Sequence, residues 1–216
     1  MSEASRYPAY DVLAKWDTPS WDEPTRRAID KRLHVSTVPR FLGATEWAVA
    51  DALCRRILPQ GADAEAVPLA ALLDAKLYAD HGDGFREADM PYMREAWRTA
   101  LAALEADANE RYGGRSFSHL SDEEQDSLVI QMQHGTLSAV HWSGLDPKKF
   151  FERRVLVDIP ALYYGHPKAW SEIGFGGPAS PRGYVRLAGD RRDPWEAAEG
   201  APGHEEAARK LNQRVV

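Results

Sequence analysis

The chain has 216 residues, of which 44% are hydrophobic and 28% are charged, and its formal net charge at pH 7 is −6. These values are typical of a soluble globular protein, and a mildly acidic chain with scattered Lys and Arg is poorly suited to bind nucleic acid or an anionic membrane. One cysteine excludes an intramolecular disulfide, and no apolar run reaches the length of a transmembrane helix.

The first forty residues, 1–40, are predicted to form an extended arm. Short helices are expected at Tyr10–Trp16 and at Glu23–Leu33, where Pro24 stands near the start. The N-terminus has no basic segment ahead of an apolar core, so it resembles neither a Sec nor a twin-arginine signal. We therefore expect the chain to act in the cytoplasm.

Residues 41–194 are predicted to form a helical domain, followed by a helical tail at 195–216. Apolar side chains recur three and four residues apart along this domain, which is the spacing of one face of an α-helix. Ser121 and Glu124 form a capping box, and Pro160 is expected to bend or locally break the helix that carries it. Helix starts are expected near Glu46, Pro68, Met93, Ser121 and Pro147, and in the tail near Glu205. The predicted fold class is therefore all-α.

The stretch Tyr163–Leu187 reads YYGHPKAWSEIGFGGPASPRGYVRL, and its aromatic residues, glycines and prolines are so dense that we expect neither a helix nor a strand to run through it. Glycines let the backbone turn and prolines stiffen it, so an ordered surface loop is predicted. His166, between Gly165 and Pro167, is expected to hold a turn by hydrogen bonding to its own backbone or to a partner. Such a loop can dock on another protein or cover this chain's own helices, and the residues alone leave both interpretations open.

Seven tryptophans are the one excess in the composition. Core packing is the simplest interpretation for most of them, although Trp is also enriched among the residues that anchor protein interfaces. The better anchor candidates lie in or beside irregular segments, namely Trp16, Trp21, Trp170 and Trp195.

The sequence contains no recognisable catalytic, cofactor or metal motif. GFGGPA, residues 174–179, matches a dinucleotide-binding fingerprint in spacing only, because no strand is predicted before it and Pro178 interrupts any helix after it. The seven histidines form no HExxH pair and one cysteine cannot build a zinc knuckle, so no metal site is predicted. Two alternatives stay open: a stand-alone enzyme with a dispersed site at His166, Glu172 and Arg182, or a general helical scaffold or chaperone.

Three ordered blocks carry a family resemblance: FLGATEWAVADALCRRILPQ, RYGGRSFSHLSDEEQDSLV and the stretch Tyr163–Leu187. All three resemble the gluconate 2-dehydrogenase subunit 3 family, the small subunits of FAD-dependent sugar and polyol dehydrogenases. The resemblance covers most of the chain from Phe41 to Asp193, so the arm at 1–40 lies outside it. Many small subunits of this family carry a twin-arginine signal, and this sequence departs from that pattern.

The resemblance implies a non-catalytic small subunit that carries no cofactor itself. It is expected to bind and stabilise a large FAD-containing subunit of the glucose–methanol–choline type, from which a cytochrome or another acceptor takes electrons. Together with the aromatic loop and the arm, it predicts nine partner-binding residues: Trp16, Trp21, Tyr163, Tyr164, His166, Trp170, Phe175, Arg182 and Tyr184.

Overall fold

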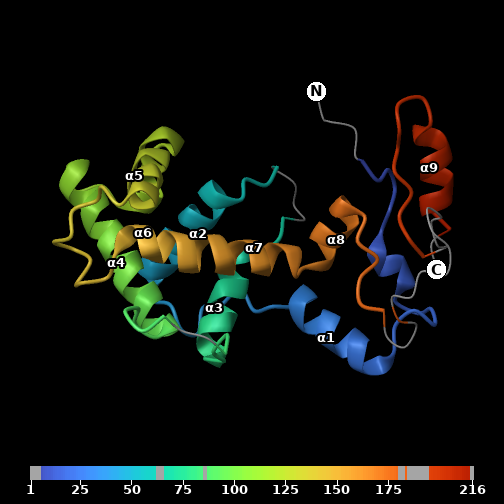
Figure 1. The fold of residues 1–216 in the computed structure, drawn as a ribbon, viewed down its shortest axis with the longest axis horizontal. Coiled ribbons are helices and arrows are strands. Elements are labelled where there is room, and N and C mark those ends of the chain that lie inside the picture. The colour runs from blue at the N-terminus through green and yellow to red at the C-terminus, as the bar shows by residue number, and fades with distance from the viewer. Residues whose placement is uncertain (1–5, 62–65, 85–86, 180–182, 184–194, 215–216) are drawn as a thin grey trace. The chain divides into compact units, whose positions relative to one another are not determined.

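The computed structural model describes residues 6–61, 66–84, 87–179, 183 and 195–214 (Figure 1). These residues form helices and no strand, which confirms the all-α fold class. Contacts group the chain into two compact units, which we name the central unit (Val35–Leu162) and the terminal unit (Met1–His34 with Tyr163–Val216). The ranges predicted from the sequence divide the chain differently, because the terminal unit combines most of the arm with the tail and with the end of the predicted helical domain.

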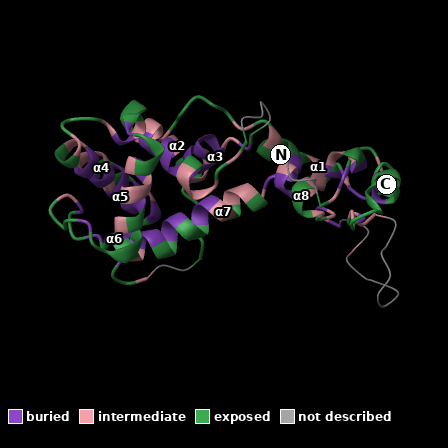
Figure 2. Ribbon diagram, turned by 90° about the horizontal axis from the view of Figure 1, so that it is seen from above, coloured by how far each residue is buried: buried purple, intermediate pink, exposed green. Residues whose placement is uncertain are grey.

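The central unit is built from helices that bury their apolar faces against one another. Leu73, Trp97 and Leu128 retain 0% exposure, and Figure 2 shows buried residues along these helices and exposed residues in the loops. No helix in the described part of the chain combines the length and apolar character that crossing a membrane requires. The elements are α2 (Ala44–Ile57), α3 (Leu69–Ala79), α4 (Met93–Arg111), a 3-10 turn η2 (Phe117–His119), α5 (Asp122–His134), α6 (Pro147–Phe150), a π-helical turn η3 (Phe151–Val155) and α7 (Leu156–Tyr164), whose last two residues belong to the terminal unit.

Local capping explains where several of these helices begin. The Ser121 hydroxyl accepts the backbone N–H of Glu124 at 3.3 Å, and the Glu124 carboxylate accepts the N–H of Ser121 at 2.9 Å. At the start of α2, the Glu46 carboxylate accepts the N–H of Gly43 at 2.7 Å. These bonds, reciprocal at Ser121 and one-way at Gly43, satisfy backbone donors that a helix N-terminus otherwise leaves unpaired. The capping box predicted from the sequence is confirmed.

The helix that contains Pro160 does not break there. It continues as α7 to Tyr164, and the π-helical turn η3 directly precedes it. Pro160 has no N–H to offer the carbonyl of Leu156, four residues earlier. Leu156 is 46% exposed, so water can replace the missing donor at the surface.

A buried carboxylate joins three helices within the central unit. Asp158 on α7 retains 0% exposure and accepts the Lys76 ammonium of α3 at 2.8 Å and the Trp97 indole N–H of α4 at 2.7 Å. Lys76 also pairs with Asp83 at 3.0 Å. Because each oxygen of Asp158 has a strong donor, its charge is stabilised in spite of full burial.

The terminal unit is described as a 3-10 turn, η1 (Val12–Lys15), with α1 (Glu23–Leu33), α8 (Pro167–Ile173) and α9 (Glu205–Asn212). Helix α1 has the predicted bounds, and its cap Asp22 accepts the N–H of Thr25 at 2.9 Å. Turn η1 is shorter than the helix expected at Tyr10–Trp16. The core cluster of this unit consists of Tyr10, Val12, Trp21, Ile29 and Trp170.

Candidate partner-binding surface

Helix α8 lies inside the stretch that the sequence predicts to be irregular, so that part of the prediction is wrong. His166 caps the helix, with its ring Nδ1 accepting the N–H of Lys168 at 3.3 Å, and Pro167 occupies the first helical position. Gly174 closes the helix in the left-handed region at φ 69°. The prolines and glycines thus bound a short helix at both ends, and His166 holds a turn through its own backbone as expected.

The capping role of His166 requires a neutral ring nitrogen that can accept a hydrogen bond. Burial, followed by the charges of Lys168 and Arg32, lowers the pKa of His166. A lowered pKa favours the neutral imidazole at neutral pH, so the cap and the ionisation state of the ring agree.

Trp170 is the centre of α8 and is 3% exposed. Its indole N–H donates to the carbonyl of Tyr164 at 2.6 Å, and its ring meets that of Phe175 edge-on at 5.7 Å. The Arg32 guanidinium lies 5.7 Å from the Trp170 ring and donates to the carbonyl of Gly165 at 2.7 Å. These contacts fix the turn between α7 and α8 from inside.

The arm supplies the other half of the core around Trp170. Trp21 is 1% exposed, and its indole N–H donates to the carbonyl of Pro178 at 2.9 Å. The N–H of Val12 donates to the hydroxyl of Ser171 at 3.1 Å. In this conformation the Trp21 and Trp170 indoles have almost no surface to offer a partner, and they instead hold the arm against the segment around α8.

Lys15 is fully buried at 0% exposure beneath this core, which the sequence did not indicate. Its ammonium donates to the Tyr10 hydroxyl at 3.1 Å and to the carbonyls of Gly176 at 3.0 Å and Trp195 at 2.6 Å. One side chain therefore joins the arm, the end of the α8 segment and the start of the tail. A buried cation is tolerated only with such a set of acceptors.

Gly177 lies where Trp21 and Val12 of the arm approach the backbone closely. Its φ is 70°, and an added Cβ would stand 2.9 Å from Trp21 Cζ2 and 3.1 Å from Val12 Cγ2. We expect Gly177→Ala to destabilise the terminal unit by about 2–4 kcal/mol, because backbone strain and overpacking act together. Chemical denaturation followed by tryptophan fluorescence measures the loss.

Gly203→Ala is the matched control for this change. Gly203 belongs to the same unit and has φ 81°, but an added Cβ meets no atom within 4 Å. It should therefore cost only the backbone strain of about 1 kcal/mol. Equal losses in the two variants would contradict the close approach of the arm to Gly177.

Several side chains around α8 remain exposed. Tyr164 is 49%, Ile173 47% and Phe175 40% exposed. The Tyr163 ring meets that of Tyr164 edge-on at 5.2 Å, and its hydroxyl donates to the Glu172 carboxylate. Burial, followed by this bond to Glu172, raises the pKa of Tyr163. Ile173 was missed from the sequence because the helix that exposes it was not predicted.

The structure thus separates the nine predicted partner contacts into groups. Trp21, His166 and Trp170 are buried, whereas Tyr164 and Phe175 are exposed. Trp16 and Tyr163 are half-buried, and Trp16 packs edge-on against Trp21 at 6.1 Å. Arg182 and Tyr184 lie outside the described residues.

The alternative catalytic site receives no geometric support from the described residues. His166 accepts the Lys168 N–H and Glu172 accepts the Tyr163 hydroxyl, and no hydrogen bond or ion pair joins His166 to Glu172. A hollow of about 270 Å³ lies beside α1 and Pro178, and neither His166 nor Glu172 lines it. The third residue of that hypothesis, Arg182, is outside the described residues.

Comparison with known families decides which class of protein this fold represents. The family model for gluconate 2-dehydrogenase subunit 3 matches residues 44–177, more than half of the chain. The chain belongs to the gluconate 2-dehydrogenase subunit 3 family. No curated protein and no solved structure matches it.

Membership in the gluconate 2-dehydrogenase subunit 3 family indicates an accessory subunit of a dehydrogenase complex. The matched region runs from the start of α2 to Gly177, so it includes α8 and its exposed neighbours. It excludes the arm, although Val12 and Trp21 of the arm complete the core around Trp170. This chain therefore uses residues outside the family match to support the last matched segment.

Proposed function

We propose that this chain is a non-catalytic small subunit that binds and stabilises a large FAD-dependent dehydrogenase subunit acting on a sugar, glycoside or polyol. The observation that carries the proposal is the family match over residues 44–177. FAD belongs to the large subunit, and this chain contributes folding support and no redox group. We further propose that the complex works in the cytoplasm and passes electrons to a cytochrome or another acceptor.

The surface proposed for the partner is the exposed rim of α8. Tyr164, Ile173 and Phe175 expose apolar area on a segment whose backbone carbonyls accept partly buried hydrogen bonds from Trp170 and Tyr10. A segment that is already ordered loses little conformational entropy on docking, and large aromatic side chains contribute much of the binding energy of interfaces. Trp21 and Trp170 act indirectly, by holding this rim in place.

We expect the double variant Tyr164→Ser/Phe175→Ser to lower the affinity for the large subunit by about tenfold or more. Both side chains are partly exposed, so the free chain should still fold, and its melting curve separates any stability lost with the Phe175–Trp170 contact from the loss of affinity. Co-expression with the large subunit, followed by purification through a tag on this chain, measures the bound flavin per chain from its absorbance.

Tyr92→Ser is the matched control for this surface. Tyr92 is 70% exposed and belongs to the central unit, whereas the residues that form the proposed rim belong to the terminal unit. Its variant should retain the wild-type flavin content. If the double variant and the control bind flavoprotein equally well, the partner docks elsewhere on this chain.

The stand-alone enzyme predicts a different outcome for the isolated chain. Turnover of a sugar or polyol with an artificial electron acceptor, by the purified chain without a second polypeptide, would overturn the proposal. A general chaperone predicts binding to many unfolded proteins without preference, which a competition between the flavoprotein and an unrelated unfolded client measures.

A further inference from the structure

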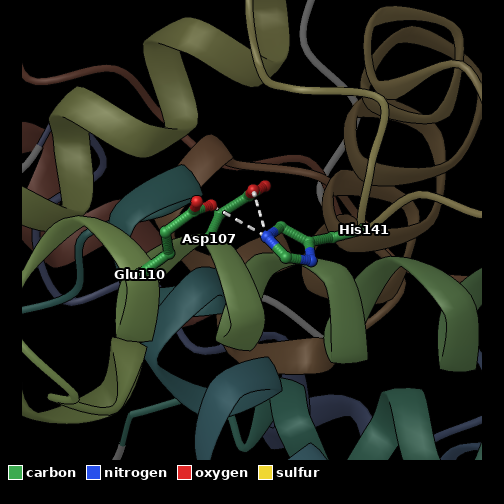
Figure 3. Close-up of side chains that lie close together, drawn as sticks. All are labelled: Asp107, Glu110 and His141. Atoms are coloured by element: carbon green, nitrogen blue, oxygen red, sulfur yellow. Dashed lines mark hydrogen bonds and ion pairs between the residues drawn. The ribbon is translucent and has the colours of Figure 1, made fainter.

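Three side chains of metal-ligating types converge in the central unit. Asp107 and Glu110 stand three residues apart on α4, and His141 reaches them from the loop between α5 and α6 (Figure 3). His141 Nε2 lies 2.9 Å from Glu110 Oε2 and 3.9 Å from Asp107 Oδ1. One ligand atom from each residue lies within 4.8 Å of the other two.

The spacing on α4 explains why the two carboxylates share this place. Residues three apart are neighbours on one face of a helix, so Asp107 and Glu110 both point toward the loop. Two like charges side by side repel each other, and only a cation between them converts that repulsion into attraction. The imidazole of His141 faces the same point, so a ligand set of one nitrogen and two oxygens results.

Asp107 is held in position from behind. It is 4% exposed, and its second oxygen, Oδ2, accepts the indole N–H of Trp142 at 2.9 Å. Ligating carboxylates in metal sites are typically oriented in this way by a hydrogen bond to the oxygen that faces away from the ion. The same bond leaves Oδ1 directed at His141.

The Glu110 side chain can move to complete the three ligands. Its side chain is 72% exposed and that of His141 is 25% exposed, so both can move by the small amount required. Adjacent ligands of a tetrahedral zinc ion lie about 3.3 Å apart, given bond lengths of about 2.0–2.2 Å. The distances from His141 Nε2 to the Glu110 and Asp107 oxygens, 2.9 and 3.9 Å, lie on either side of this value. Rotation of the Glu110 and His141 side chains can therefore complete the site without moving the backbone at Asp107.

We propose that Asp107, Glu110 and His141 bind a divalent first-row transition ion of the zinc class, with solvent completing the coordination. Mixed imidazole and carboxylate ligands suit these ions, and zinc binds such sites more tightly than manganese or iron(II). The ion ties the loop between α5 and α6 to α4 and has a structural role. Trp142, next to His141, is fully buried and already anchors this part of the loop to α4, so the ion adds to an existing contact.

Direct pairing of protonated His141 with the two carboxylates is the competing explanation. The two explanations differ in what Zn²⁺ does, since an ion pair without a metal gains nothing from added zinc. They also differ for Co²⁺, which gives visible d–d absorption when protein ligands replace its water shell.

The test titrates Zn²⁺ into the full chain, after removal of any affinity tag, in competition with a chromophoric chelator. We expect one ion per chain, a rise in melting temperature on binding, and Co²⁺ absorption bands that Zn²⁺ abolishes. Glu110→Gln and His141→Gln should each weaken Zn²⁺ binding by tenfold or more. Glu110→Gln is the sharper variant, because this exposed side chain contributes little to folding.

His134→Gln is the matched control, since His134 is an exposed histidine at the end of α5 in the same unit. It should bind Zn²⁺ as the wild type does. The proposal is overturned if the wild type binds no Zn²⁺ above the level of the Glu110→Gln variant. It is also overturned if His134→Gln loses as much affinity as His141→Gln.

Discussion

Trp170→Ala is expected to destabilise the terminal unit by about 3–5 kcal/mol, the usual cost of removing a large buried aromatic side chain. Trp170 is 3% exposed, and the change empties the space between Trp21, Val12 and Phe175. It also removes the indole donor that the carbonyl of Tyr164 accepts at 2.6 Å. Thermal unfolding should show a melting temperature lower by roughly 12 °C or more for this unit, at about 4 °C or more per kcal/mol.

Leu211→Ala is the control for this prediction, because Leu211 is a large apolar residue of the same unit that is 48% exposed. It should cost about 0.5 kcal/mol or less. Limited proteolysis adds a local readout, since loosening of this core should open the arm to cleavage before the central unit. A Trp170→Ala variant as stable as Leu211→Ala would contradict the buried position of the indole.

Asp158→Ala is expected to destabilise the central unit by about 3–5 kcal/mol, since it removes one member of a buried ion pair. The change leaves the Trp97 indole N–H without its acceptor and deprives Lys76 of its fully buried partner. Burial alone would lower the pKa of Lys76, but its bonds to Asp158 and then Asp83 outweigh burial and raise it. Because the pKa of Lys76 is higher in the folded than in the unfolded chain, its ion pair contributes fully to the free energy of unfolding below the unfolded pKa of about 10.4. This contribution is lost only as the pH rises through the folded pKa. Measurements at pH 7 therefore test the intact pair.

Two further variants separate the charge of Asp158 from its hydrogen bonds. Asp158→Asn keeps an acceptor for Trp97 and should fall between the wild type and the alanine variant in urea denaturation. Asp51→Ala removes the carboxylate of a surface pair with Arg55 and should cost about 0.5 kcal/mol or less. If Asp158→Ala matched Asp51→Ala, the buried network would not support the central unit.

Helix starts could be predicted because their causes are local. The capping box of Ser121 with Glu124, and Pro24 in the first turn of α1, act within a few residues and can be read directly from the sequence. Apolar spacing then assigned the buried faces of α2 and α4. These signals gave the all-α class and most of the central unit.

Helix α8 was missed because the proline and glycine that mark its two ends were interpreted as residues that prevent a helix. Pro167 is unfavourable inside a helix but favourable at the first position, and Gly174 is the usual closing residue. The seven residues of this helix were too few to show a helical period in a segment rich in aromatic residues. The signal was present as a proline after His166 and a glycine after Ile173.

The core of the terminal unit could not be predicted, because its contacts join residues far apart in the chain. Trp21 meets Pro178 across 157 positions, and Lys15 meets Trp195 across 180. Nothing in the local sequence of an arm indicates whether its tryptophans face a partner or the chain's own C-terminal segment. The approach of His141 to Asp107 and Glu110 was hidden for the same reason.

The most direct test of the proposed role is purification of the tagged chain from its native host, followed by an absorbance spectrum and a dehydrogenase assay of the eluate. The account predicts a second, larger polypeptide with flavin bands, which oxidises a sugar, glycoside or polyol. A single colourless chain, without flavoprotein and from cells that produce the dehydrogenase, would contradict the proposed small-subunit function.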